Sequence, residues 1–165
     1  ETKAAVLHDP FKRETIGAVK GEGVALRNNR RVTNFRADEY PIHVSEEALL
    51  GSSVAICGYR AFKEHDPYKL SAVIMNEGNG SRIVDTGSFC YDSMLVARGH
   101  WTAVIGGFDT CHDGAAVSLI VAEAGGKVTD LDGNDQRYDR PMNGIVVSNG
   151  VVHDEILEKI AECKK

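Results

Sequence analysis

Short apolar runs that alternate with longer helix-like stretches dominate the sequence from residue 54 onward. The run from Val54 to Cys57 stops at Gly58, and similar runs cover Trp101 to Ile105 and Gly144 to Ser148. Such runs are too short for helices and fit buried strands. Helix-like composition covers 68–76, 88–98, 115–124 and 151–163. This alternation predicts the α/β class, as a layered α/β sandwich in which helices cover a mixed sheet.

The amino-terminal residues follow another pattern. Strand-like runs at 3–7 and 14–19 flank the turn signal Asp9-Pro10, and Gly21-Glu22-Gly23 precedes a third run from Val24 to Leu26. We therefore expect an antiparallel hairpin and meander over 1–31, an α/β core over 52–165, and a single domain spanning 1–165. Residues 32–50 carry no pattern that assigns an element. Because a strand-like run follows Glu1 so closely, we also expect the chain to be part of a longer protein.

The bulk properties exclude several classes of protein. The 19 Lys and Arg residues and 24 Asp and Glu residues are scattered, with no basic stripe, so we expect no nucleic-acid partner. No apolar stretch approaches the ~20 residues that span a bilayer, so we expect no membrane partner. The four cysteines are too widely spaced for a paired metal motif or a disulfide framework, and they predict reduced thiols in a cytoplasmic protein.

One segment carries a specific motif. Cys111-His112-Asp113-Gly114-Ala115-Ala116 leads into an apolar helix, then Glu123-Ala124-Gly125-Gly126 and a strand-like run that reaches Asp130. This order resembles the carboxy-terminal signature of the inositol monophosphatase family, Trp-Asp-x-Ala-Ala-Gly followed by a helix and Glu-Ala-Gly-Gly. Gly87-Ser88 and its helix resemble the family's Gly-Ser/Thr-Ala helix, and residues 8–31 resemble the hairpin that follows its amino-terminal domain.

The resemblance implies the carboxy-terminal half of a Mg²⁺-dependent phosphatase. Its substrate would be a small phosphorylated metabolite, such as an inositol phosphate, a sugar phosphate or a related phosphate monoester, hydrolysed by metal-activated water. By the same resemblance, Asp113 is a metal ligand. Gly87 and Ser88, at the start of another helix, could bind substrate through backbone N–H groups. Because the loss of a neighbouring domain would expose apolar surface, we expect the protein to be a homodimer.

The sequence also departs from the family pattern. In the family, a Glu-Glu pair and an Asp-Pro-Ile/Leu-Asp-Gly-Thr motif supply most of the metal ligands. Neither motif occurs in this sequence. This chain alone is therefore expected to be inactive. His112 replaces the family's Trp, and Gly106 stands where some members carry an acidic residue that holds substrate hydroxyls. The second departure speaks against inositol itself.

Each candidate residue also has a purely structural interpretation. Without the family, Asp113 is most simply a helix N-cap, and Ser88 is equally well an ordinary cap. Asp109 could reach the site of Asp113 or serve its own loop, and His112 could donate to that site or be exposed. The acidic run at 130, 132 and 135 is similar to a calcium loop but lacks the later Glu, which favours a β-turn.

A second function remains open at this stage. The chain could be a non-catalytic binding or assembly module derived from the same fold, with its exposed surface paired against another copy. The two hypotheses differ in whether further carboxylates accompany this chain, because a multi-metal site needs several oxygen ligands at one point.

Overall fold

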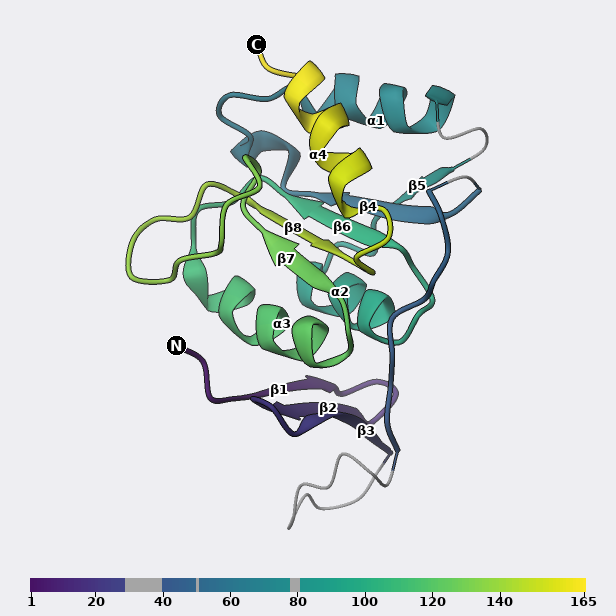
Figure 1. Ribbon diagram of the computed structural model, residues 1–165, viewed down its shortest axis with the longest axis vertical. Coiled ribbons are helices and arrows are strands. Elements are labelled where there is room, and N and C mark those ends of the chain that lie inside the picture. The colour runs from purple at the N-terminus through teal and green to yellow at the C-terminus, as the bar shows by residue number, and fades with distance from the viewer. Residues whose placement is uncertain (29–39, 50, 78–80) are drawn as a thin grey trace.

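A computed structural model describes residues 1–28, 40–49, 51–77 and 81–165. Its elements form four layers, in which two sheets alternate with two helix pairs (Figure 1). The predicted layered α/β fold with a mixed sheet is confirmed.

The amino-terminal layer is a three-stranded antiparallel sheet in the order β1-β2-β3. Its strands are β1 (Ala4–Asp9), β2 (Glu14–Val19) and β3 (Gly23–Asn28). The Asp9 carboxylate closes the first turn by accepting hydrogen bonds from the backbone N–H groups of Phe11 and Lys12 at 2.9 and 3.1 Å. Of the segment 1–31, the described residues up to Asn28 form this meander, and 29–31 lie outside the described residues.

The second sheet has five strands in the order β5-β4-β6-β8-β7. They are β4 (Ser53–Cys57), β5 (Arg82–Val84), β6 (Ala103–Gly106), β7 (Lys127–Thr129) and β8 (Ile145–Ser148). Strand β4 pairs in parallel with β5 and β6, whereas β8 pairs antiparallel with β6 and β7. Every residue of β6 and β8 is buried, which explains why these strands read as continuous apolar runs.

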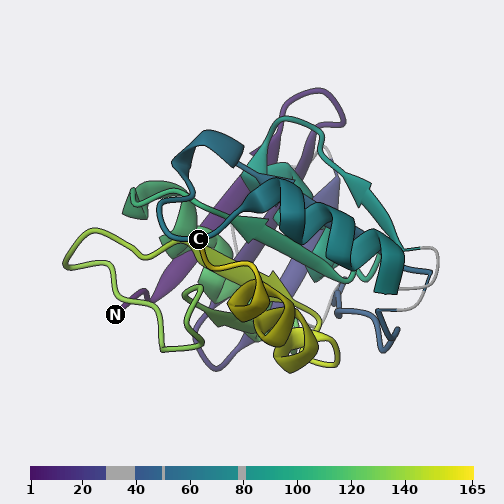
Figure 2. The ribbon, with the colours of Figure 1, turned by 90° about the horizontal axis from the view of Figure 1, so that it is seen from above.

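Two helices cover each face of this sheet. Helices α1 (Pro67–Glu77) and α4 (His153–Glu162) lie side by side on the face that points away from the three-stranded sheet (Figure 2). A 3₁₀ turn at Tyr59–Ala61 precedes α1 in the chain. Helices α2 (Phe89–Ala97) and α3 (Cys111–Glu123) lie between the two sheets (Figure 1). The apolar side chains form two clusters, one for each face of the five-stranded sheet. None of the helices in the described part of the chain is long and apolar enough to cross a membrane.

Polar contacts join the meander to the helices that lie against it. The Glu123 carboxylate at the end of α3 accepts hydrogen bonds from the backbone N–H groups of Gly21 and Gly23. The Arg98 guanidinium, just after α2, forms a 2.7 Å ion pair with Glu14 on β2. The orientation of the meander against α2 and α3 is therefore set by hydrogen bonds as well as by apolar burial.

The interpretation of Asp113 as the N-cap of α3 is wrong. The helix begins at Cys111 with Thr110 as its N-cap residue, so Asp113 lies inside the first turn and is not the cap. Helix α2 begins as predicted, with Ser88 as N-cap and its hydroxyl oxygen accepting from the Tyr91 N–H at 3.4 Å. Of the unassigned segment 32–50, the described residues 40–49 form no helix or strand, although Leu49 is buried.

Candidate active site

The predicted residues Gly87 and Ser88 follow the carboxyl end of β5, and Asp113 follows the carboxyl end of β6. Cys57 ends β4, Asp85 comes directly after β5, and β6 ends at Gly106 before the loop that leads to α3. The carboxyl ends of parallel strands lie at one edge of a sheet, where ligands of open α/β sheets usually bind. The start of α2 and the start of α3 are therefore brought to the same edge.

Asp113 is exposed in the first turn of α3, where the helix dipole favours negative charge. Among the described residues its carboxylate forms no ion pair, and its neighbour is the Cys90 thiol of α2, with 3.9 Å between Sγ and Oδ1. Burial, together with the Asp113 charge, raises the pKa of Cys90 to about 11. The carboxylate thus keeps oxygen lone pairs free for a cation, next to a neutral thiol.

A cavity of about 430 Å³ lies between the turn that follows β1 and the start of α2. Helix α2 and the residues before it contribute Thr86, Ser88, Cys90 and Tyr91 to its wall. The Lys12 ammonium on the turn donates to the Tyr91 hydroxyl at 2.5 Å and lies 5.1 Å from the centre of that ring. Ser88 and Cys90 therefore face one cavity, and Cys90 links it to Asp113.

The backbone of Gly87 already has a hydrogen-bond partner. Its N–H donates to Asp85 Oδ1 at 2.7 Å, and the φ angle of Gly87 is +83°, a conformation that favours glycine. Ser88 serves as the helix cap described above and also lines the cavity. The assignment of Gly87 and Ser88 to substrate binding stays a prediction.

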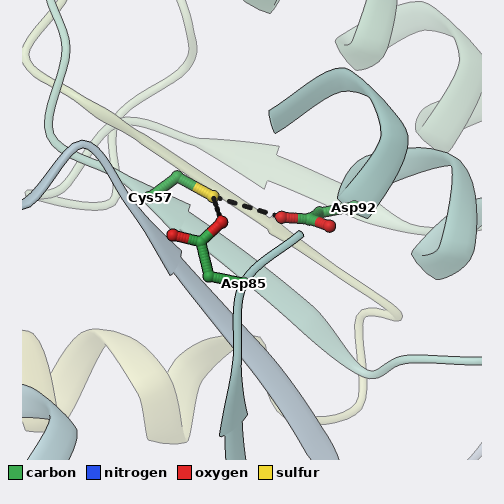
Figure 3. Close-up of side chains that lie close together, drawn as sticks. All are labelled: Cys57, Asp85 and Asp92. Carbon is green, nitrogen blue, oxygen red and sulfur yellow. Dashed lines mark hydrogen bonds between the residues drawn. The ribbon is translucent and has the colours of Figure 1, made fainter. Parts of the chain in front are cut away.

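Sequence reasoning missed a cluster formed by Cys57, Asp85 and Asp92 (Figure 3). The Cys57 Sγ atom lies 3.4 Å from Asp92 Oδ2 and 3.8 Å from Asp85 Oδ1, and the Thr86 hydroxyl donates to Asp92 Oδ1 at 2.6 Å. Asp92 is fully buried, and burial raises its pKa. Burial and the two carboxylates also raise the pKa of the Cys57 thiol far above its usual range. The available signal was Asp92, an acidic residue inside an otherwise apolar helix.

The remaining candidates lie in ordinary structural settings. Asp109 is exposed and accepts from the Lys63 ammonium at 2.9 Å, which lowers its pKa, and His112 is exposed. Asp130 Oδ1 accepts from the backbone N–H groups of Asp132 and Asn134, which confirms a turn in place of a calcium loop. At Gly106, an added Cβ atom would lie 2.4 Å from the ring of Phe108, so no acidic side chain fits there unless that ring moves.

The comparisons with known proteins agree with the geometry. Residues 1–165 match the Inositol monophosphatase family. The chain is 28% identical over 162 residues to "Fructose-1,6-bisphosphatase/inositol-1-monophosphatase" of Thermotoga maritima, covering 98% of this chain and 56% of that protein. It is 31% identical over 157 residues to "Phosphatase IMPL1, chloroplastic" of Arabidopsis thaliana, covering 89% of this chain and 36% of that protein.

Solved structures give the same result. "Thermotoga maritima IMPase TM1415" superposes with a TM-score of 0.76 at 28% identity, over 98% of this chain and 57% of that chain. An inositol monophosphatase from Anabaena superposes with a TM-score of 0.77 at 23% identity, over 98% of this chain and 59% of that one, which shows the shared fold. The chain spans about half the length of the curated Thermotoga relative. The sequence motifs, the layered fold and these matches agree that this chain belongs to the inositol monophosphatase family.

Proposed function

We propose that this chain forms part of a metal-dependent phosphatase that hydrolyses small phosphate monoesters. The observation that carries the proposal is the exposed Asp113 carboxylate, which lacks an ion pair among the described residues and lies beside Cys90 of the cavity wall. The names of the relatives support the reaction class, because both describe phosphatases and that of the Thermotoga maritima protein names fructose-1,6-bisphosphatase and inositol-1-monophosphatase activities.

We propose Mg²⁺ as the metal and Asp113 as one of its ligands. The donor fits, because hard cations take carboxylate oxygens and the oxygens of Asp113 are accessible. When bound, the metal would activate water and neutralise the leaving oxygen of the ester. One carboxylate is too few for such a site, and the other donor cluster in the described residues, with Cys57, Asp85 and Asp92, does not include Asp113. We therefore propose that further ligands come from outside the described residues.

The other residues of this edge would orient the substrate. Ser88 lines the cavity, and its hydroxyl can donate to a substrate oxygen while its oxygen caps α2. Lys12 contributes a positive charge on the facing wall. These groups suit the polar alcohol part of an inositol phosphate, a sugar phosphate or a related monoester.

The test is Asp113→Asn in the intact protein. The amide keeps the size of the side chain but is a poorer ligand for a hard cation, so Mg²⁺-dependent turnover should fall at least a hundredfold, while the melting temperature should hardly change. Phosphate release and thermal melting measure the two quantities. Asp109→Asn is the matched control, because Asp109 lies four residues upstream and is paired with Lys63.

The stability of the Asp113→Ala variant shows whether Asp113 also has a structural role. Since Asp113 is in the first turn and is not the cap, Asp113→Ala should cost only about 0.3–1 kcal/mol, the usual value of an acidic residue near a helix start. Full activity in Asp113→Asn would remove the metal-ligand assignment.

A further inference from the structure

Helix α1 carries apolar side chains on its solvent side as well as on its buried side. Leu70 and Ile74 on the inner face are 0% exposed and belong to the apolar cluster of the five-stranded sheet. On the outer face, Tyr68 and Met75 are 71% and 52% exposed, and Ala72 between them is exposed as well. A surface helix normally places polar residues there, whereas a helix that is apolar on both faces is usually buried. The outer face of α1 therefore suits contact with another molecule.

The three exposed apolar residues form one row along α1. Tyr68, Ala72 and Met75 are spaced by four and by three residues, so they lie above one another on successive turns. The Tyr68 ring also packs against the ring of Tyr59, with 5.1 Å between the ring centres. Aromatic residues and Met are enriched in protein interfaces, and the same spacing of anchors is typical of helix recognition. The row therefore fits the apolar face of an amphipathic helix.

Helix α4 lies beside α1 in the same layer and adds negative charge to this surface (Figure 2). Its exposed acidic residues are Asp154, Glu155, Glu158 and Glu162. The first two are paired with lysine side chains, at 2.8 and 3.8 Å. Glu158 and Glu162 form no ion pair within the described part of the chain. We call the surface formed by these two glutamates and the apolar row of α1 the outer helix face.

The two unpaired glutamates gain nothing from their own helix. They are four residues apart, so their like charges lie on neighbouring turns and repel each other. Glu162 is the last residue of α4, where the helix dipole disfavours negative charge. The Lys69 ammonium of α1 donates to the backbone oxygen of Glu162 at 2.6 Å and so stabilises the helix end without pairing with a carboxylate. A cationic partner would offset the charges of both glutamates.

We propose that the outer helix face binds a basic amphipathic helix of another protein. The apolar side of that helix would cover the row of Tyr68, Ala72 and Met75, and its Lys or Arg residues would pair with Glu158 and Glu162. An anionic membrane or a nucleic acid would meet like charge on α4. A second copy bound through this face would bring the same acidic surface against itself, because a twofold interface joins the same patch of both subunits. This inference does not depend on the proposed phosphatase function.

The first experiment tests the apolar row in the intact protein. The probe is a synthetic helical peptide with leucines on one face and lysines on the other, and fluorescence anisotropy of the labelled peptide gives its Kd. Tyr68→Ser should raise the Kd about tenfold or more, because exposed aromatic anchors dominate such contacts, and Met75→Ser should act in the same direction. Val6→Ser is the matched control, because Val6 is 62% exposed on β1 of the other sheet. Thermal melting checks that each variant is folded.

The second experiment tests the charges. Replacing Glu158 and Glu162 together with Gln should raise the Kd and should flatten its dependence on salt, since screening acts on exposed charges. Glu22→Gln, at an exposed residue of the β2–β3 turn, should leave both quantities unchanged. A peptide with glutamates in place of the lysines should not bind. An unchanged salt dependence in the double variant would overturn the charge argument.

Other outcomes assign the surface differently. Equal losses in Val6→Ser and Tyr68→Ser would show that the peptide binds any exposed apolar residue, and the proposal would be wrong. If light scattering shows a dimer that Tyr68→Ser converts to a monomer, the face belongs to a second copy of this chain. If the unmodified protein binds vesicles of phosphatidylcholine and phosphatidylserine and Tyr68→Ser abolishes this binding, the occupant is a lipid surface. Either result contradicts a basic protein helix as the partner.

Discussion

His153 is a fully buried side chain whose two ring nitrogens both have hydrogen-bond partners. Nε2 lies 2.9 Å from the Thr129 hydroxyl on β7 and Nδ1 lies 2.8 Å from the Ser148 hydroxyl on β8, so the first residue of α4 joins the helix to two strands. Burial lowers the pKa of His153 from 6.5 to about 4. The folded protein therefore holds this imidazole neutral.

This arrangement predicts a stability that depends on pH. Between pH 6.5 and 4 the unfolded chain binds a proton at His153 and the folded chain does not, so the free energy of unfolding falls as the pH drops through this range. The full contribution, up to about 3 kcal/mol, is present above pH 6.5. Urea unfolding at several pH values should show a flatter dependence for His153→Gln than for the unmodified protein. An equal flattening in His100→Gln, at an exposed histidine, would contradict this account.

At the scale of elements, Glu123 attaches the meander to α3. A negative side chain at the end of a helix is disfavoured by the helix dipole, so its presence there needs compensation. The N–H groups of Gly21 and Gly23 supply it at 2.8 and 2.9 Å, in a turn where both glycines have positive φ angles. The helix end and the β2–β3 turn therefore stabilise one another.

Replacing Glu123 with Gln should weaken this attachment. The amide can accept at its oxygen, but its NH₂ group faces the second backbone N–H, which loses its partner. The free energy of unfolding should fall by about 1.5–3 kcal/mol, the usual value of hydrogen bonds to a charged group. Denaturant unfolding measures the change, and Glu162→Gln, at the last residue of α4, is the matched control. Equal losses in the two variants would show that the contact with the turn contributes nothing.

At the scale of the whole molecule, the parallel strands β5, β4 and β6 gather the site at one sheet edge, where Asp113 is the proposed metal ligand and Asp85 and Asp92 belong to a separate cluster with Cys57. Residues 1–165 alone should therefore release no phosphate from a generic monoester with Mg²⁺, because one carboxylate cannot build a multi-metal site. A colorimetric phosphate assay checks this. Mg²⁺-dependent turnover that disappears in Asp113→Asn would show that the chain is sufficient by itself. The homodimer stays a prediction, for which light scattering is the measurement.

The local sequence determined which helices and strands form and where most of them end. The apolar run at Val54 to Cys57 becomes β4, and Ser88 caps α2 as its side chain predicts, because each outcome depends on residues that are neighbours in sequence. The motif around Asp113 identified the family for the same reason. The interpretation of Asp113 as the cap of α3 was wrong, because the helix begins two residues earlier, at Cys111, after Thr110.

Only the tertiary structure decided how these elements meet. The strand order places β4 between β5 and β6, and this order brings Cys57 against Asp85 and Asp92 although 28 and 35 residues separate them. The contact between Cys90 and Asp113 likewise needs α2 packed on α3. Sequence patterns report the exposed or buried character of each residue. They do not report which distant residue it contacts, because that contact depends on how helices pack on both faces of the five-stranded sheet.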